Sequence, residues 1–316
     1  MSAEGARAIA IIIPVFNRAK AIERAIRSVL AQEFRDFELI VIDDGSTDAT
    51  AHIVAEFKDP RLKLICQDSN CGSNAARNRG IREARAPLIT FLDSDDAYLP
   101  HKLAVVARTF AEQPELDVLL DSFLKEYGED DRRQPVPRIN PVISDTGKFI
   151  NALFNRRLWK ATSAISIRRE IALKAGLFDE SLKRRQDFDF LIRASKVGRC
   201  CSISEVTWTK NWTPGAISDD VRTFASATVD LCARHPEYFD NPAFRPGLAR
   251  DVARHFARLL KAGRIADAAA DASKFRRQFS AGGFTRLLVQ GSKEVTLRRS
   301  AKRSVESDVP TGRNSE

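Results

Sequence analysis

The sequence predicts an α/β fold in which a doubly wound, mostly parallel sheet carries helices on both faces and an all-helical region follows. Two observations support this prediction. Through the first 120 residues, short apolar runs typical of buried strands alternate with segments of helical periodicity, and such alternation favours a parallel sheet. From about residue 219 onward only helical periodicity remains.

Five apolar runs mark the strands expected in the first 120 residues. The first reads AIAIII, and a continuous apolar run is typical of a strand buried on both faces. Between the runs, apolar residues fall on one helical face, as Ile22, Ile26 and Val29 do. The expected strands occupy 8–13, 37–43, 61–65, 88–93 and 117–120.

The rest of the chain is divided by composition. Residues 125–147 are polar and contain proline, which predicts a surface loop. A strand at 163–167 and helices at 169–175 and 188–196 are expected next. Gly263 separates two apolar helical stripes, a pattern typical of a helical hairpin. The expected units are an α/β domain at 1–218, a helical region at 219–300 and a disordered tail at 301–316.

The net charge of +9 is concentrated in the last third of the chain. Residues 1–218 hold 33 Lys/Arg and 30 Asp/Glu, whereas residues 219–316 hold 18 and 12. A basic end suggests an anionic partner such as a membrane surface or nucleic acid, although a solvated helical face is the simpler interpretation. The charge is diffuse and no aromatic–basic platform accompanies it, so nucleic-acid binding is not expected.

Cysteines and apolar runs bear on the cellular compartment. The five cysteines form no CxxC pair, and the adjacent Cys200 and Cys201 are a poor disulfide pair, which predicts reduced thiols and no zinc site. The first apolar run is broken by Pro14 and is too short for a secretory signal. No run reaches the length of a transmembrane helix. We therefore expect a cytoplasmic protein.

Two acidic residues end the strand expected at 37–43. Asp43 and Asp44 precede Gly45, which permits a turn, and Ser46 can cap the following helix. The segment fits an ordinary strand–turn–helix junction. It equally fits a nucleotide site, because carboxylates at the ends of parallel strands accept hydrogen bonds from ribose or base.

Three carboxylates crowd the end of the strand expected at 88–93. Asp93, Asp95 and Asp96 lie within four residues, where like charges repel one another. A hard cation such as Mg²⁺ or Mn²⁺ relieves this repulsion, and diphosphate oxygens can complete its ligand shell. An acidic turn that caps the helix near Leu99 is the alternative. The position at the end of a strand favours the metal site.

Two later segments place charged residues on helices. Arg77 and Arg79 follow the third strand and can contact diphosphate oxygens, although exposed arginines on a surface helix are the simpler interpretation. Asp187 and Asp189 open a helix, where the helix dipole favours acids without any further role. The functional alternative is a general base that accepts a proton from an attacking hydroxyl.

Several common catalytic signatures are absent. The sequence shows no Ser-His-Asp or Cys-His arrangement, no GxGxxG and no Walker A motif, which argues against a dinucleotide dehydrogenase and a P-loop NTPase. The four histidines lack metal-ligand spacing, and no catalytic role is expected for His52, His101, His235 or His255.

Taken in order, segments from about residue 8 to residue 200 resemble the family 2 glycosyltransferases, which are inverting enzymes of the GT-A fold. The matching segments are IIIPVFNR, QEFRDFELIVIDDGSTDAT, NCGSNAARNRGI, LITFLDSDDAYLPHKL, SIRRE, AGLFDESL and QDFDFLIRASKVG. Each segment alone is unspecific, whereas their order and spacing together are specific. The resemblance implies the GT-A fold, a nucleotide-diphospho-sugar donor, and Mn²⁺ or Mg²⁺ as cofactor.

The resemblance implies a nucleotide-binding role for several residues. Pro14 and Asn17 correspond to the point where the first strand meets the nucleotide. Asp44 corresponds to the carboxylate that contacts the base, and Asp43 is its neighbour in the same pocket. Arg77 corresponds to an arginine near the diphosphate.

The resemblance also implies the metal ligands and the catalytic base. Asp93 and Asp95 correspond to the metal-binding Asp-X-Asp, with Asp95 favoured as the direct ligand. Asp187 corresponds to the second residue of the family's Glu-Asp pair, which is the catalytic base. Gln186 stands at the first position, and this departure removes a neighbouring charge and leaves the acceptor geometry open.

A segment after the base loosely resembles the basic or aromatic loop that this family often carries there. It reads TWTKNWTPGAIS, and it would bring Lys210, Trp208 and Trp212 near donor or acceptor. The implied reaction is a single displacement. Asp187 deprotonates the acceptor hydroxyl, whose oxygen attacks the anomeric carbon, while the metal and Arg77 stabilise the leaving nucleoside diphosphate.

The expected function is therefore transfer from a nucleotide-diphospho-sugar, preferably a UDP-sugar, to a saccharide or lipid-linked acceptor in bacterial cell-surface polysaccharide or glycolipid synthesis. Two alternatives stay open. One is a nucleotide-sugar binding module without turnover, and the other is a nucleotidyltransferase, which usually has a Gly-rich basic loop where this chain reads PVFNRAKA. The basic C-terminal helices either contact the inner face of the plasma membrane or form a lid or dimer surface.

Overall fold

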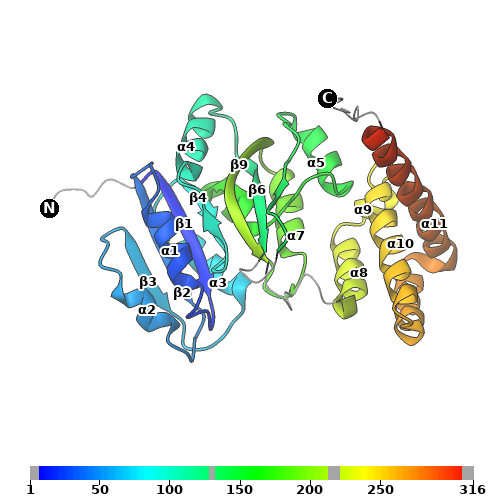
Figure 1. Cartoon of the computed structure of the whole chain (residues 1–316), viewed down its shortest axis with the longest axis horizontal. Coiled ribbons are helices and arrows are strands. Elements are labelled where there is room, and N and C mark those ends of the chain that lie inside the picture. Colours follow the sequence, from blue (N-terminus) through cyan, green and yellow to red (C-terminus); the bar gives the residue numbers. More distant parts are fainter. Residues whose placement is uncertain (1–6, 128–131, 213–220, 308–316) are drawn as a thin grey trace, which may run out of the picture. The chain divides into compact units, whose positions relative to one another are not determined.

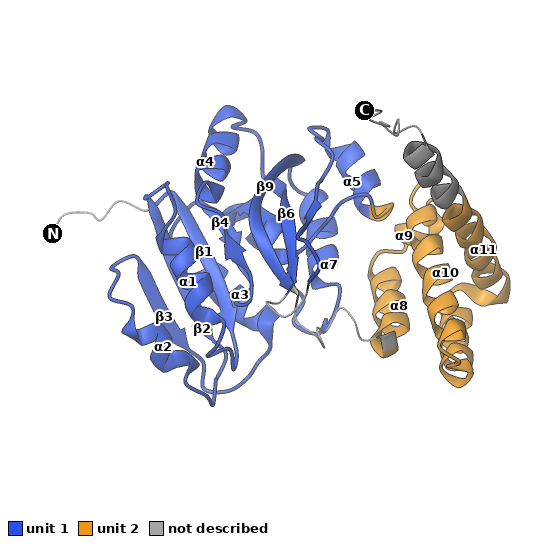
Figure 2. Cartoon of the chain, in the orientation of Figure 1, with its two compact units in different colours: residues 1–153, 157–216 blue, residues 154–156, 217–316 orange. Residues whose placement is uncertain are grey.

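The structure is a computed structural model, and it describes residues 7–127, 132–212 and 221–307 (Figure 1). Two compact units make up the chain, the first over 1–153 and 157–216 and the second over 154–156 and 217–316 (Figure 2). The boundary expected after residue 218 falls within 213–220, outside the described residues.

A nine-stranded mixed sheet forms the centre of the first unit. Its hydrogen-bonded order is β3-β2-β1-β4-β8-β6-β9-β5, and β7 pairs with β6 outside this path. The strands are β1 (Ile9–Val15), β2 (Phe37–Asp43), β3 (Leu62–Cys66), β4 (Leu88–Phe91), β5 (Ala97–Tyr98), β6 (Val118–Tyr127), β7 (Val136–Arg138), β8 (Ile165–Arg168) and β9 (Cys200–Trp212).

The half of the sheet built from β3, β2, β1 and β4 is entirely parallel. Every residue of β1 is buried, as the continuous apolar run predicts. The helices α1 (Ile22–Leu30), α2 (Thr50–Glu56) and α3 (Ser73–Glu83) connect its strands. Gly80 allows α3 to approach the sheet, because a Cβ at this position would lie 2.5 Å from Ile12 Cγ2.

The other half of the sheet is mixed, because β8 runs antiparallel to both β4 and β6, while β9 runs parallel to β6. Its helices are α4 (Lys102–Glu112), α5 (Thr146–Phe154), α6 (Arg169–Lys174) and α7 (Gln186–Ser195). The doubly wound α/β prediction is confirmed, but the parallel pairing that alternation favours holds throughout only the β3–β4 half.

Two segments expected to be loops contain strands. Residues 125–147 include the end of β6 and all of β7, which pair from Phe123 to Lys125. The segment that begins TWTKNW belongs to β9 as far as Trp212. β7 and the end of β9 have polar sequences, but backbone hydrogen bonds to β6 hold them as strands. The side-chain pattern alone therefore does not predict them. The 3₁₀ turn Thr162–Ala164 also replaces the start of the strand expected at 163–167.

The second unit is helical over its described residues. It contains a 3₁₀ turn (Val221–Thr223), α8 (Phe224–Arg234), α9 (Glu237–Asp240), α10 (Arg245–Lys261) and α11 (Ile265–Ser307). Gly263 has a positive φ of 68° between α10 and α11, so the predicted helical hairpin is confirmed. Ser280 departs from helical geometry inside α11.

The end of α11 enters the segment expected to be disordered. The helix extends through 301–307, because no glycine or proline interrupts the sequence between Gly291 and Ser307. Residues 308–316 lie outside the described part of the chain. Within that part, we find no helix that combines the length and apolar character needed to cross a bilayer.

Candidate active site

The residues expected to bind the nucleotide lie where strands of the parallel half end. Asp43 is the last residue of β2 and pairs with Val15, the last residue of β1. The acidic turn 93–96 follows β4 directly. Because carboxyl ends of parallel strands meet at one edge of a sheet, these groups lie at the edge where ligands bind in such folds.

Asp43 and Asp44 are both buried, but their hydrogen bonding differs. Asp44 Oδ1 accepts from the Cys71 amide at 2.8 Å and from Gln67 Nε2 at 2.5 Å, and its Oδ2 accepts from the Gly72 amide at 2.8 Å. Asp44 thus holds the loop before α3. Asp43 Oδ2 accepts from the Ser46 amide at 3.2 Å, whereas its Oδ1 has no partner among the described residues.

Pro14 and Asn17 have structural roles at the end of β1. Pro14 is buried within β1 and pairs with Ile42. Asn17 Oδ1 accepts from the Thr47 amide at 2.8 Å, and the Asn17 amide donates to Ser46 Oγ at 2.9 Å. Asn17 therefore joins the two loops that follow β1 and β2. Its side-chain oxygen is engaged in this connection.

Arg77 lies in α3, and its guanidinium group is buried. Its Nη2 donates to Asp93 Oδ1 at 2.7 Å, and its Nη1 donates to Ser73 Oγ and Asn74 Oδ1, both at 3.2 Å. Burial acts to raise the pKa of Asp93, but the charges of Arg77 and Lys210 outweigh burial and lower it. Arg79, in contrast, forms an exposed ion pair with Glu83.

Asp95 and Asp96 experience different surroundings in the acidic turn. Burial raises the pKa of Asp95, and the neighbouring Asp93 carboxylate adds to the rise. Asp96 is fully buried, and its Oδ2 accepts from Ser163 Oγ at 2.7 Å. Burial raises its pKa to about 8, against the effect of the Lys210 cation. Asp96 is thus turned into the protein, and Asp93 and Asp95 remain half-exposed.

Lys210 connects the acidic turn to the predicted base. Its Nζ lies 3.9 Å from Asp96 Oδ2, and its side chain is 36% exposed. Burial acts to lower the pKa of Lys210, but the charges of Asp96, Asp93, Asp95 and Asp187 outweigh burial and raise it. One ammonium group therefore lies in the field of all four carboxylates.

Asp187 lies in the first turn of α7, as the sequence predicts. Its Oδ1 accepts from the Phe188 amide at 2.8 Å, and its Oδ2 lies 3.5 Å from Lys160 Nζ. Gln186 Oε1 is buried without a hydrogen-bond partner among the described residues. Asp189 forms a buried ion pair with Arg193 at 2.6 Å and stabilises the helix.

Two contributors to this site have no signal in the local sequence. Lys160 precedes the 3₁₀ turn, and Ser163 lies within it. Ser163 Oγ accepts from the Asp93 amide at 3.0 Å and donates to Asp96, so it connects both ends of the acidic turn. Lys160 and Ser163 lie just before β8, and they reach the site because β8 pairs with β4, which comes much earlier in the sequence.

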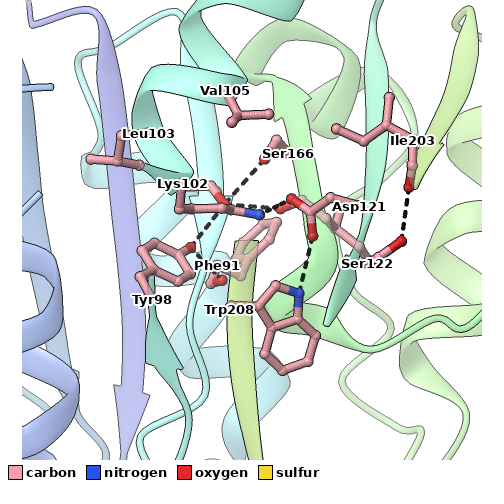
Figure 3. A network of polar contacts seen from close by, with 12 residues as sticks. Phe91, Tyr98, Lys102, Leu103, Val105, Asp121, Ser122, Ser166, Ile203 and Trp208 are labelled. Atoms are coloured by element: carbon pink, nitrogen blue, oxygen red, sulfur yellow. Dashed lines mark hydrogen bonds and ion pairs between the residues drawn. The ribbon is translucent and has the colours of Figure 1, made fainter. Parts of the chain in front are cut away.

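Trp208 does not line the site. Its side chain is fully buried and stacks on Phe123 with a centroid distance of 4.5 Å. Its Nε1 donates to Asp121 Oδ1 at 3.0 Å (Figure 3). The expectation that Trp208 lies near donor or acceptor is therefore wrong, because its whole side chain packs in the core of the first unit against Phe123 and Asp121. The side chain of Trp212 lies outside the described part.

The donor set of the acidic turn suits a cation that binds together with a diphosphate. Among the described residues, no group of three or more His, Cys, Asp or Glu side chains is arranged to hold a metal ion by itself. Asp93 and Asp95 offer carboxylate oxygens, which Mg²⁺ and Mn²⁺ prefer, and diphosphate and water oxygens complete such shells. The residues thus fit a shared site better than a preformed metal cage.

Comparisons with known sequences agree with this geometry. The model of glycosyl transferase family 2 matches residues 10–180, more than half of the 316-residue chain. The succinoglycan biosynthesis protein ExoO of Rhizobium meliloti is 34% identical over 203 residues, which cover 62% of this chain and 58% of that protein. The Escherichia coli protein UDP-Glc:alpha-D-GlcNAc-diphosphoundecaprenol beta-1,3-glucosyltransferase WfgD is 41% identical over 95 residues, 30% of this chain and 38% of that protein. This chain thus spans less than two thirds of these relatives.

Comparisons with solved structures concern the fold. Staphylococcus aureus TarS 1–349 in complex with UDP-GlcNAc superposes with a TM-score of 0.67 at 19% identity, covering 94% of this chain and 92% of that one. The mannosyltransferase PcManGT from Pyrobaculum calidifontis, in complex with GDP-Man and Mn²⁺, gives 0.57 at 18% identity, with coverages of 91% and 80%. The predicted GT-A fold is confirmed. Because the family model spans most of the sheet and the acidic turn, the chain belongs to glycosyl transferase family 2.

Proposed function

We propose that this glycosyltransferase moves a sugar from a nucleotide-diphospho-sugar to an acceptor hydroxyl, with inversion at the anomeric carbon and Asp187 as the general base. One observation carries the proposal. Lys210 Nζ lies 3.9 Å from Asp96 Oδ2 of the acidic turn, and the charge of Asp187 is among those that raise the pKa of Lys210, so the proposed proton acceptor and the proposed diphosphate site lie near the same ammonium group. A single displacement needs the base and the leaving group on opposite sides of one anomeric carbon.

The base is held by its own helix and by a cation. The Phe188 amide donates to Asp187 Oδ1, and Lys160 Nζ lies near Asp187 Oδ2. Asp187 takes the proton of the acceptor hydroxyl as the bond from oxygen to the anomeric carbon forms. The bond between that carbon and the diphosphate oxygen breaks, and its electron pair leaves with the nucleoside diphosphate.

The leaving group meets cationic side chains of this chain. The Lys210 ammonium group lies near Asp96 in the acidic turn, and the buried Arg77 guanidinium group forms an ion pair with Asp93 in the same turn. Preorganised positive charge at the departing oxygens stabilises the transition state more than the ground state. Mn²⁺ or Mg²⁺, when bound with the diphosphate at Asp93 and Asp95, would supply further positive charge there.

Asp43 is the better candidate for a direct contact with the nucleotide. The chain's own donors already satisfy Asp44, whereas Asp43 Oδ1 is a buried acceptor without a partner among the described residues. A base N–H or a ribose hydroxyl would satisfy this oxygen and remove the cost of leaving it unpaired. The UDP-GlcNAc named for TarS and the UDP-Glc named for WfgD support a UDP-sugar as donor.

The names of the relatives also suggest the acceptor class. ExoO is named for succinoglycan biosynthesis, and the WfgD name includes a diphosphoundecaprenol-linked acceptor. We therefore propose a saccharide or lipid-linked hydroxyl as acceptor, in the synthesis of a bacterial polysaccharide or glycolipid. A binding module without turnover is the competing proposal.

The decisive experiment is a panel of UDP-, GDP- and dTDP-sugars, each assayed for nucleoside diphosphate release with and without Mn²⁺. It compares the wild-type protein with Asp187→Asn and with Glu170→Gln, a matched control in which an exposed acid in the first turn of α6 loses its charge. Both variants lose the same helix-dipole interaction. We expect Asp187→Asn to retain donor binding and lose transfer by about 10²–10⁴-fold, the range for general-base catalysis.

Three outcomes would count against the proposal. Undiminished transfer by Asp187→Asn would reject Asp187 as base. Equal losses in Asp187→Asn and Glu170→Gln would point to helix stability instead of proton transfer. Binding of a donor by the wild-type protein, without turnover of any donor in the panel, would favour the binding module.

We further propose that the tip of the α10–α11 hairpin contacts the anionic inner face of the plasma membrane. Leu260 and Ile265 flank the turn and are 56% and 60% exposed. Arg254, Arg258 and Lys261 are exposed on the last turns of α10, and no ion pair joins them to an acid among the described residues. Exposed apolar side chains among basic ones suit the interface of an anionic bilayer.

Flotation with liposomes tests this contact. The full chain should be recovered in the floating fraction with phosphatidylglycerol-containing vesicles, and in the bottom fraction with neutral vesicles. Leu260→Ser/Ile265→Ser should lower recovery, whereas Val289→Ser, which removes an equally exposed apolar side chain from α11, should not. Equal recovery of all three proteins, or equal binding to neutral vesicles, would exclude the hairpin tip as the contact.

A further inference from the structure

A buried polar network lies in the first unit, outside the residues assigned to the reaction so far. Lys102 begins α4 and Asp121 lies on β6, and both side chains have no exposed surface. Asp121 Oδ2 accepts from Lys102 Nζ, and its Oδ1 accepts from Trp208 Nε1 at 3.0 Å. Figure 3 shows the lysine and the indole converging on this carboxylate from α4 and β9.

Stability alone does not account for this pair. Withdrawing two charges from water is expensive, and apolar residues of similar volume often replace a buried ion pair without loss. What such a pair supplies is a defined geometry, since each partner accepts only a few arrangements of the other.

The network crosses the place where the β6–β9 ladder is irregular. Leu120 pairs with Ser202 and Ser122 pairs with Val206, so β9 advances by four residues while β6 advances by two. A second shift follows between Ser122 and Phe123, which pairs with Trp208. The Asp121 side chain therefore reaches β9 where the backbone ladder does not define a continuous register. Ser122 Oγ adds a bond to the Ile203 carbonyl at 2.9 Å.

The register of β9 determines where Lys210 lies. β5 pairs with β9 only through Ala97 with Thr209 and Tyr98 with Trp208. Asp96 directly precedes β5, and its Oδ1 accepts from the Asn211 amide at 3.3 Å. A slip of one residue in β9 would turn Lys210 to the opposite side of the sheet. The acidic turn would then lose its ammonium group.

We propose that Lys102, Asp121 and Trp208 act as positioning residues, which hold β9 in register across its irregular segment and thereby place Lys210 against the acidic turn. The consequence for catalysis rests on the proposed function, because the acidic turn is the donor site only under that proposal. The effect on β9 itself does not depend on it.

The test replaces the network by apolar side chains of similar size in the variant Lys102→Met/Asp121→Leu/Trp208→Phe, which leaves no charge unpaired. Its matched control is His255→Phe/Asp271→Leu, which removes a buried pair of 2.8 Å from the second unit. Thermal melts followed by circular dichroism establish folding. Amide hydrogen exchange of β9 and titration with UDP in the presence of Mn²⁺ are then measured on the full chain.

We expect the triple variant to melt cooperatively, with exchange of β9 amides accelerated at least tenfold and exchange of β1 and β2 unchanged. Its affinity for UDP with Mn²⁺ should fall at least tenfold, whereas the control should match the wild type in both measurements. Unchanged β9 exchange in a folded triple variant would overturn the inference. Absence of UDP binding by the wild-type protein would instead reject UDP as the nucleotide of the proposed donor, and the exchange experiment would still decide the role of the network.

A second variant covers failure of the triple variant to fold. Trp208→Phe removes the five-membered ring of the indole with its N–H and keeps a six-membered aromatic ring for the stack on Phe123. We expect at least threefold faster exchange at the β9 amides and a weaker affinity for UDP. Exchange and affinity equal to those of the wild type, in a folded Trp208→Phe protein, would also overturn the inference.

Discussion

The two halves of the sheet build the candidate site in different ways. In the parallel half, each functional residue follows its strand within a few positions, as Asp43 follows β2 and Asp93 follows β4. In the mixed half, Lys160, Asp187 and Lys210 come from three separate segments, and the sheet places two of these segments by pairing β8 with β4 and β6 and by pairing β9 with β6. A contiguous motif is therefore enough to predict the first half, whereas the second requires the tertiary fold.

The halves also differ in how their charges are satisfied. Asp44 and Asn17 in the parallel half are bound by the chain's own donors and act as structural connections. In the mixed half, the single ammonium group of Lys210 interacts with the charges of several carboxylates, which raise its pKa. We therefore expect substitutions in the parallel half to divide between stability and nucleotide affinity, and substitutions in the mixed half to act mainly on turnover.

The largest contrast is expected within the acidic turn, where the two halves meet. Asp95→Asn should lower kcat/KM by about 10²–10³-fold, the effect of removing one group that stabilises transition-state charge, and should raise the Mn²⁺ concentration needed for half-maximal rate. Asp93→Asn should in addition lower the free energy of unfolding by about 1–3 kcal/mol, because Arg77 is left buried without its charged partner.

Steady-state kinetics over a Mn²⁺ series and thermal melts separate these effects. Chelation with EDTA should abolish the activity of the wild-type protein, and added Mn²⁺ should restore it. A wild-type rate in EDTA would remove the metal from the mechanism. Equal melting temperatures of the two variants would show that the Arg77–Asp93 pair does not support the fold.

An intermediate effect is expected from Lys210→Met. Loss of this ammonium group removes charge that faces both the leaving group and Asp187, so kcat should fall by about 10²-fold while the melting temperature stays close to that of the wild type. Lys63→Met is the matched control. Lys63 lies on β3, the outer strand of the parallel half, and forms an ion pair with Glu83 at the protein surface. A loss in KM alone, with kcat unchanged, would assign Lys210 to donor binding only.

The smallest effects distinguish the two neighbouring carboxylates of β2. Asp43→Asn should raise the KM for the donor about tenfold, equivalent to about 1.4 kcal/mol of binding free energy, because Oδ1 loses its acceptor strength. Asp44→Asn should lower the free energy of unfolding by about 1–3 kcal/mol with little direct effect on KM, since an NH₂ group replaces one carboxylate oxygen and either the Cys71 or the Gly72 amide before α3 loses its acceptor. Donor titration and urea unfolding measure both quantities. The reverse pattern would return the nucleotide contact to Asp44.

Several features were predictable because they depend on local interactions. The buried run of β1, the end of β2 at Asp43 and the start of α7 beside Asp187 agree with the structure. Glycine at 263 ends α10 where the chain adopts a positive φ, which an L side chain adopts only with strain. These signals lie within a few residues of the element they define.

The sequence by itself determined the parallel half, the family and the acidic residues that carry its motifs, because burial periodicity and turn chemistry act over a few residues. Only the tertiary structure decided that Asp44 is satisfied by the loop before α3, that Trp208 belongs to the core, and that Lys210 reaches Asp96. The last two outcomes depend on strand pairing between segments about a hundred residues apart, as from Ala97 to Thr209. Hydrogen-bond ladders accept many side-chain patterns, so the partner and register of a strand are settled by packing of the whole sheet.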